Sequence, residues 1–269
     1  MSPPSPLELA ERLHFLAEDL AEPMTLDGLT RDFKIFQRRR GHRHSTDDLL
    51  TAWYAATHAA LPVRTMLDLG TGIGTVGLAL VWYFDEAELT AVEVQPVSFR
   101  LLRENVWANG VASRVRAIQG DLREVTPAGP FDLVTGSPPY FDVKAGIVSA
   151  DPQRAGARFE LCGDVRDYCR AAKGALAPGG RFVFCFPTVQ RRRAERACEE
   201  ARLSIVFASD VIPKEGLPAL FSLFSCAHEP GAASSEELPM VVRDRSGAHT
   251  PEMTRARRLF GMAGEAERP

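Results

Sequence analysis

The segment Asp68-Leu-Gly70-Thr-Gly72-Ile-Gly74 alternates glycine with other residues. The residues before it, 63–69, are short and apolar like a buried parallel strand, and the residues after it have the composition of a helix. Glycine lets the backbone turn sharply and approach a ligand without a Cβ atom in the way. A strand, a glycine loop and a helix in this order direct backbone N–H groups at a bound ligand. The segment therefore predicts a nucleotide-type site.

Acidic residues stand at the ends of the predicted strand before this loop and of the two predicted strands after it. Glu93 ends the predicted strand 88–93, about twenty residues beyond the loop, where a carboxylate accepts hydrogen bonds from ribose hydroxyls. Asp121 follows a predicted strand near 114–118, where an adenine edge would lie. Asp68, placed before the first glycine, is typical of loops that bind S-adenosylmethionine (SAM) rather than dinucleotides. We therefore expect SAM as the cofactor; the alternative is a structural glycine turn with ordinary surface acids.

Ser137-Pro138-Pro139-Tyr140 follows the predicted strand 131–135, at the end of the strand where open α/β sheets bind their ligands. An amino group conjugated to a base or an amide is a poor nucleophile, because its lone pair is delocalised. A site helps when it accepts both N–H protons, here through the Ser137 side chain and the Pro138 carbonyl. Two prolines with fixed φ hold that carbonyl rigidly.

Aromatic residues complete this second motif. Tyr140 and Phe141 can stack on a planar acceptor, which is worth roughly 1–3 kcal/mol per base. The proton of the amino group becomes acidic once the methyl group is transferred, so positioned acceptors suffice without a strong general base. We expect Ser137, Pro138 and Tyr140 to be catalytic, with Pro139 and Phe141 against the acceptor. A proline turn with a packed aromatic is the alternative.

Five stretches of the chain resemble one group of enzymes. They are Phe33–Gln37 with the arginine-rich run after it, Ser45–Trp53, Ser137–Phe141, Asp151–Glu160 and Leu176–Phe182. On these stretches, within roughly residues 25 to 260, the chain resembles the class I SAM-dependent methyltransferases with an [N/D/S]-P-P-[Y/F] motif. More narrowly, it is similar to the bacterial valine-tRNA adenine-N6 methyltransferases.

The resemblance implies a role for each matching residue. SAM would be held by Gly70, Gly72, Gly74 and Glu93, with Asp121 at the adenine and Thr46 and Asp47 near the methionine part. The acceptor would contact Ser137, Pro138 and Tyr140, and Arg158 would lie on the substrate side. Ser137 departs from the family, which usually has Asn there. A serine offers one hydroxyl acceptor at shorter reach, so a second N–H bond needs a water.

Charge and composition bear on the partner. The chain has 269 residues, 45% of them hydrophobic, and a net charge of −3, whereas a dedicated nucleic-acid binder is usually basic overall. Basic clusters are nevertheless present at 38–44, 191–193 and 255–258. We expect the first of these to hold RNA phosphates through Arg38, Arg39 and Arg40. A solvated charged face is the alternative for each cluster.

Other features of the sequence argue for absences. The five cysteines form no C-x-x-C pair and the six histidines do not cluster at metal-ligand spacing, so we expect no metal and no disulfide. No apolar run approaches the roughly twenty residues of a membrane span. Residues 1–6 lack the features of a signal peptide. These observations favour a cytoplasmic protein, and we expect a monomer although the sequence does not determine the oligomeric state.

Alternating strands and helices between residues 63 and 228 predict the fold class. We expect an α/β protein with a doubly wound, mostly parallel seven-stranded sheet and an antiparallel edge hairpin made by 203–212 and 219–227. Three parts are expected: an N-terminal helix and basic arm at 1–45, a methyltransferase domain at 46–230, and a linker with a C-terminal strand and helix at 231–269 that packs on the same domain.

The leading hypothesis is therefore N6-methylation of adenine in RNA, most plausibly tRNA, with the base flipped onto Tyr140. A protein glutamine amide presents the same planar amino group, although the enzymes that methylate it usually keep Asn at the Ser137 position. A small-molecule amine is a further acceptor that the acidic pI allows. A non-enzymatic SAM-binding or RNA-binding module is the third hypothesis, and the intact glycine loop argues against it.

Overall fold

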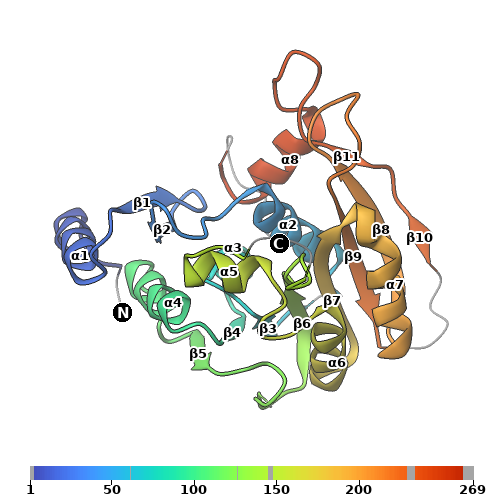
Figure 1. Cartoon of the computed structure of the whole chain (residues 1–269), viewed down its shortest axis with the longest axis horizontal. Coiled ribbons are helices and arrows are strands. Elements are labelled where there is room, and N and C mark those ends of the chain that lie inside the picture. Colours follow the sequence, from blue (N-terminus) through green and yellow to red (C-terminus); the bar gives the residue numbers. More distant parts are fainter. Residues whose placement is uncertain (1–2, 61, 126, 145–147, 229–233, 263–269) are drawn as a thin grey trace.

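A large mixed sheet runs through the computed structural model, which describes residues 3–60, 62–125, 127–144, 148–228 and 234–262 (Figure 1). The sheet order is β10-β8-β9-β7-β6-β3-β4-β5, with β11 beside β8. The strands are β3 (Thr65–Leu69), β4 (Glu88–Glu93), β5 (Val115–Gln119), β6 (Phe131–Gly136), β7 (Leu176–Pro187), β8 (Ser204–Ile212), β9 (Phe221–Ala227), β10 (Ser235–Glu236) and β11 (Met240–Val241).

The pairing of the strands confirms the expected fold class. Strands β5, β4, β3, β6 and β7 are parallel to their neighbours, and β9 inserts antiparallel between β7 and β8. Among the described residues, the large sheet has nine strands rather than the seven expected. The two additional strands have two residues each and pair with β8, and β10 lies in the segment 231–237 that was expected to be a linker.

Helices cover both faces of the sheet, because side chains alternate between its two sides along each strand. Met66 belongs to one buried cluster and its neighbour Leu67 to the other. The first cluster contains residues of α2 (Thr46–His58), α3 (Thr75–Tyr83), α4 (Pro96–Ala108) and α8 (Pro251–Leu259). The second contains residues of α6 (Val165–Ala175) and α7 (Arg191–Glu200). The sheet is therefore doubly wound, as predicted.

The N-terminal segment packs against α4. It consists of α1 (Pro6–Asp19) and an antiparallel hairpin of β1 (Met24–Gly28) and β2 (Lys34–Arg38). Asn105 on α4 accepts a hydrogen bond from the Phe36 amide at 2.6 Å and donates one to the Phe36 carbonyl at 3.2 Å. The side chain of Asn109 bridges the backbone of Lys34 in the same way. The hairpin is thus fixed to the sheet through α4.

One short helix was not expected from the sequence. It is α5 (Pro152–Arg158). Its N-cap residue is Asp151, whose side chain accepts a hydrogen bond from the Arg154 amide at 2.9 Å. The helix precedes α6 and lies near the carboxyl ends of the central strands (Figure 1). It therefore closes one side of the pocket described below.

Candidate active site

A pocket lies at the carboxyl ends of β3, β4, β5 and β6, the edge of the sheet at which open α/β proteins bind ligands. The loops after all four of these strands contribute to its wall. The lining includes Asp68, Gly70, Gly72, Glu93, Gln95, Gly120, Leu122, Ser137 and Pro139, together with His42, Asp48, Gly156, Ala157, Cys162 and Tyr168 from other parts of the chain. The glycine loop and the start of the Ser-Pro-Pro-Tyr motif therefore share one pocket.

Asp68 fastens the glycine loop from within. Its buried carboxylate accepts hydrogen bonds from Thr71 Oγ1 at 2.5 Å, the Gly77 amide at 3.1 Å and Thr135 Oγ1 at 2.8 Å. Burial raises the pKa of this carboxyl above its ordinary value, against these hydrogen bonds. Three protein donors already occupy the carboxylate, so the structure gives Asp68 the task of shaping the loop.

Two glycines of the loop need their lack of a side chain for different reasons. A Cβ atom on Gly70 would lie 2.0 Å from the Tyr168 hydroxyl, so the buried tyrosine fills that place. A Cβ atom on Gly72 would meet no atom within 4 Å, and its φ of +60° is a left-handed conformation that favours glycine. The backbone at Gly72 is thus open toward the pocket, as a loop that cradles a ligand requires.

Glu93 stands beside this open backbone at the end of β4. Its Oε2 atom accepts a hydrogen bond from the Gly72 amide at 2.8 Å and its Oε1 atom accepts one from the Gln95 amide at 2.7 Å. Burial raises the pKa of Glu93 to about 6. The Glu93 carboxylate can accept hydrogen bonds from the ribose hydroxyls of SAM, and the open glycine loop leaves room for its adenosine part. The residues present therefore fit the expected cofactor.

The Ser-Pro-Pro-Tyr loop is held from several sides. The Tyr140 hydroxyl donates to Asp47 Oδ2 at 3.0 Å and lies 3.2 Å from Cys185 Sγ on β7. The Tyr140 ring packs edge-on against Phe186, with centroids 6.0 Å apart. The backbone carbonyl of Tyr140 accepts a hydrogen bond from Gln190 Nε2 at 2.7 Å. A loop with this many contacts is preorganised, so little entropy is lost when it positions an acceptor.

The other residues of the motif take different positions. Ser137 is half-buried in the pocket wall, 3.9 Å from Cys185 Sγ, and Pro139 is buried beside it. Pro138 is buried but does not line the pocket. Phe141 is 37% exposed, and the Arg158 guanidinium lies 5.6 Å from its ring centroid. Phe141 and Arg158 thus form a cation–π pair on the surface next to the loop.

The start of α2 supplies a pocket residue that was not predicted. Thr46 is exposed, Asp47 binds Tyr140, and neither of them lines the pocket, so their expected place near the cofactor stays a prediction. The next residue, Asp48, does line it and accepts from the Ser45 amide at 2.9 Å. Burial and the neighbouring Asp47 raise the pKa of Asp48 well above its ordinary value. The signal available in the sequence was the pair of consecutive acids, Asp47 and Asp48, at the start of this helix. The sequence did not indicate which of the two faces the pocket.

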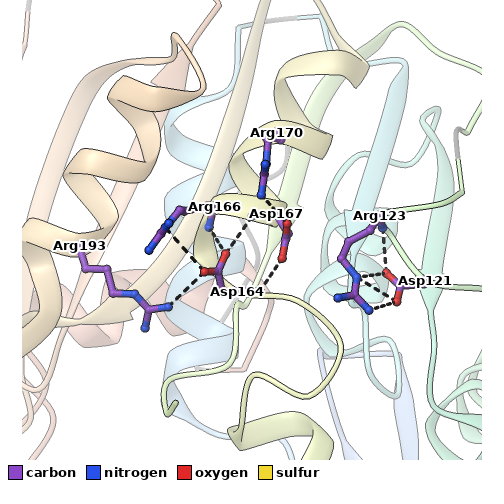
Figure 2. A network of polar contacts seen from close by, with 7 residues as sticks. All are labelled: Asp121, Arg123, Asp164, Arg166, Asp167, Arg170 and Arg193. Atoms are coloured by element: carbon purple, nitrogen blue, oxygen red, sulfur yellow. Dashed lines mark hydrogen bonds and ion pairs between the residues drawn. The ribbon is translucent and has the colours of Figure 1, made fainter. Parts of the chain in front are cut away.

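Asp121 also differs from its expected position. Gly120 and Leu122 line the pocket, whereas the Asp121 side chain turns to Arg123 and accepts from its Nη2 at 2.5 Å (Figure 2). The hydrogen bond with Arg123 lowers the pKa of Asp121. In this conformation Asp121 is an ion-paired residue outside the pocket, so contact with an adenine would require the pair to separate.

The three arginines of the basic arm are not equivalent. The Arg38 side chain is 14% exposed and pairs with Glu22 and with Asp151, the latter at 2.7 Å. This ion-paired position corrects the expectation that Arg38 is directed at phosphates, because two carboxylates already neutralise it. Arg39 and Arg40 are exposed, and neither side chain forms an ion pair within the described part of the chain.

His42 and Tyr168 line the pocket without having been predicted to do so. His42 was interpreted as part of the basic run, but burial lowers its pKa below the ordinary value and so favours the neutral imidazole. Tyr168 lies on α6, nearly one hundred residues after the loop that it contacts. Only the tertiary packing brings these side chains to the pocket.

Within the described ranges, no group of three or more His, Cys, Asp or Glu side chains is arranged to hold a metal ion. Helices long and apolar enough to cross a membrane are also absent from the part of the chain that the structure describes.

Comparison with known proteins identifies the class and then the family. The fold and the pocket define a SAM-dependent methyltransferase, and residues 57–142 match the TRM5/TYW2 methyltransferase domain. The chain is 30% identical over 205 residues to the tRNA1(Val) (adenine(37)-N6)-methyltransferase of Actinobacillus pleuropneumoniae serotype 5b, covering 73% of this chain and 82% of the relative. The chain belongs to this family, which confirms the resemblance found in its sequence.

Other similarities agree with this assignment. The enzyme of the same name from Histophilus somni (strain 129Pt) is 28% identical, over 82% of this chain and 91% of the relative. A solved structure described as a predicted O-methyltransferase, protein Atu636 from Agrobacterium tumefaciens, superposes with a TM-score of 0.63. It is 20% identical and covers 82% of this chain and 99% of its own, which supports the fold alone.

Proposed function

We propose that this enzyme transfers the methyl group of SAM to N6 of an adenine in tRNA. The position named for its relatives, adenine 37 of tRNA1(Val), is the first candidate. The observation that carries the proposal is that Ser137, from the acceptor motif, lines the same pocket as Gly72 and Glu93. An acceptor nitrogen at Ser137 is therefore next to the place suited to SAM.

The acceptor residues act by position rather than by proton abstraction. Bound SAM supplies the electrophilic methyl group. Ser137 Oγ, in the pocket wall, accepts one N–H proton of the amino group. The carbonyl of the next residue, Pro138, which does not line the pocket in this structure, is proposed to accept the other once the acceptor is bound, so that the lone pair turns toward the pocket. Tyr140 holds the base by stacking, and its hydroxyl, fixed by Asp47, keeps the ring from turning. Preorganised acceptors in a partly buried site stabilise the charge that develops on the nitrogen.

The remaining site residues have distinct roles in this proposal. Gly70, Gly72, Gly74 and Glu93 hold SAM, and Asp68 keeps the loop in shape. Asp48 is the acid of α2 that lines the pocket, and in this proposal it faces SAM. Phe141 and Arg158 contact RNA at the mouth of the site, since an arginine and an aromatic ring can both stack on bases.

The RNA backbone needs contacts outside the pocket as well. Arg39 and Arg40 are exposed at the end of β2 and are free to bind phosphates, whereas Arg38 supports the hairpin. A tRNA substrate also implies that the enzyme works in the cytoplasm. We propose that the enzyme acts as a monomer.

The test is methyl transfer from labelled SAM to total tRNA, ribosomal RNA and a protein extract in separate reactions. Nucleoside mass spectrometry then identifies the labelled product. We expect N6-methyladenosine in tRNA, and loss of label when adenine 37 of a tRNA1(Val) transcript is replaced by guanine. Label only in protein would instead favour a glutamine amide as the acceptor. Confirmed SAM binding without transfer to any of these pools would reject tRNA methylation.

A further inference from the structure

A groove outside the cofactor pocket runs between α1 and α4, which lie next to each other at one end of the molecule (Figure 1). Its volume is about 730 Å³, within the range of ligand sites. Its lining combines arginines with aromatic residues and includes Arg12, Phe99, Arg100, Arg103, Trp107 and Gln119. We name it the α1–α4 groove.

The charge of the α1–α4 groove is positive. Its lining contains three arginines and one acid, Glu104. That acid is already neutralised, because Arg12 binds both of its oxygens at 2.6 Å. Arg103 is exposed and has no carboxylate partner within the described ranges. Arg100 is paired in turn with Asp19 of α1, so Arg103 is the arginine of this lining that a polyanion would meet without a carboxylate beside it.

Aromatic rings lie beside Arg12, and two of the aromatic residues, Phe99 and Trp107, line the groove. The Arg12 guanidinium is 4.9 Å from the Phe15 ring centroid and 5.8 Å from that of Trp107. Phe15 is 46% exposed, and Phe99 and Trp107 are half-buried with part of each side chain accessible. Unpaired bases stack on aromatic rings and on guanidinium planes, while their phosphates bind arginines. This combination suits a single RNA strand better than a duplex or an acidic peptide.

The groove adjoins the cofactor pocket along the sheet edge. After β4, Gln95 lines the pocket and Pro96 lines the groove. At the end of β5, its last residue, Gln119, lines the groove, and the next residue, Gly120, lines the pocket. From β6, which carries the acceptor motif, to β5 is a distance of three strand spacings, or about 14 Å. A few nucleotides can span this distance.

We propose that the α1–α4 groove binds unpaired nucleotides that flank the methylated adenine of the tRNA, an inference that rests on the proposed function. Arg103 contacts a phosphate, and a base stacks on Trp107 or Phe99. The groove then sets which loop of the RNA presents its adenine to Ser137, without touching the reacting atoms.

Two groove variants and one matched control test this proposal. Arg103→Gln removes an exposed charge and Trp107→Leu removes a stacking surface. The control, Arg64→Gln, removes an exposed arginine that pairs with Glu86 and precedes β3, at the amino end of this central strand and so away from the cofactor pocket. We expect tRNA affinity to fall about threefold to fivefold for Arg103→Gln and about tenfold for Trp107→Leu. For Arg103→Gln the slope of log K against log salt should decrease by about 0.7, the contribution of one single-strand phosphate contact.

The kinetic readout separates RNA docking from catalysis. KM for tRNA should rise in the groove variants while kcat and the Kd for SAM stay at wild-type values, and Arg64→Gln should match wild type in all three. Wild-type tRNA affinity in both groove variants would overturn the groove proposal even if methylation proceeds. Arg103 is a surface residue, so its variant remains informative if Trp107→Leu does not fold. Wild-type protein that binds tRNA without methylating it would reject the proposed function, and the binding assay would still decide on the groove.

Discussion

The Tyr140 hydroxyl donates a hydrogen bond to Asp47 Oδ2 across 3.0 Å and 93 positions of sequence. This bond joins the acceptor loop after β6 to the first turn of α2. The residue after Asp47, Asp48, lines the cofactor pocket. The hydrogen bond therefore connects the acceptor loop to the helix turn beside the cofactor pocket. A substitution of Tyr140 tests whether this connection matters for turnover.

Replacement of Tyr140 should separate its two roles. Tyr140→Phe keeps the ring but removes the bond to Asp47, so we expect a decrease in kcat of about tenfold with SAM affinity unchanged. Tyr140→Ala also removes the stacking surface and should lose most turnover. Steady-state kinetics with tRNA and calorimetry with SAM measure both effects. Normal methylation by Tyr140→Ala would show that the ring does not hold the acceptor.

Gly72→Asp should abolish SAM binding, because it places a carboxylate at the open side of the loop next to Glu93. Its φ of +60° also adds a backbone cost of roughly 1–2 kcal/mol. Gly216→Asp is the matched control, since Gly216 has a φ of +86° and open surroundings but lies outside the pocket. Calorimetric titration with SAM should show no binding for the first variant and wild-type binding for the second. Equal SAM affinity in both would mean that the cofactor does not contact the loop at Gly72.

The pKa of Glu93 predicts a pH dependence. Burial raises it from 4.5 to about 6, so the folded protein binds this proton more tightly than the unfolded chain does. The free energy of unfolding without ligand should therefore fall by about 2 kcal/mol in total as the pH rises from well below 4.5 to well above 6. SAM affinity should increase over the same interval, because ribose hydroxyls need the ionised carboxylate as acceptor. Calorimetry at pH 5 and pH 7.5 measures the difference in affinity.

Glu93→Gln is the control for this pH dependence. The variant should bind SAM more weakly at pH 7.5 and should lose the step near pH 6. Other titratable side chains also face the pocket, namely Asp48, Asp68 and His42, and burial shifts the pKa of each of them. A step of unchanged size in Glu93→Gln would assign the titration to one of these groups.

The sequence predicted the parts of the site that depend on local pattern. The glycine loop and the strands before it follow from composition and period alone, and β4 has the predicted bounds of 88–93. The position of Asp121 was not predictable, because Arg123 two residues later competes for its carboxylate. Asp48 and His42 reach the pocket only through packing of the N-terminal segment. A strand of two residues such as β10 is too short to show a period.

The basic arm offers a comparison between a buried and two exposed arginines. Arg38→Gln should destabilise the protein by about 2 kcal/mol, because it leaves Glu22 and Asp151 without their partner. The double variant of Arg39→Gln and Arg40→Gln should keep its stability within about 0.5 kcal/mol and weaken tRNA binding instead. Chemical denaturation measures the first effect, and tRNA binding at two salt concentrations measures the second. Unchanged tRNA affinity in the double variant would place the RNA elsewhere.

Ser137→Asn tests the departure from the family at the acceptor site itself. Asparagine has a carbonyl acceptor with longer reach, so it can take an N–H bond that Ser137 must share with a water. The neighbouring Cys185 Sγ, 3.9 Å from Ser137 Oγ, limits the space for the larger side chain. We expect adenine methylation to be retained or raised, and Ser137→Ala, which has no acceptor, to lower kcat about tenfold. Product analysis by nucleoside mass spectrometry compares the two. A complete loss in Ser137→Asn with SAM binding intact would indicate a pocket shaped for a different acceptor than adenine.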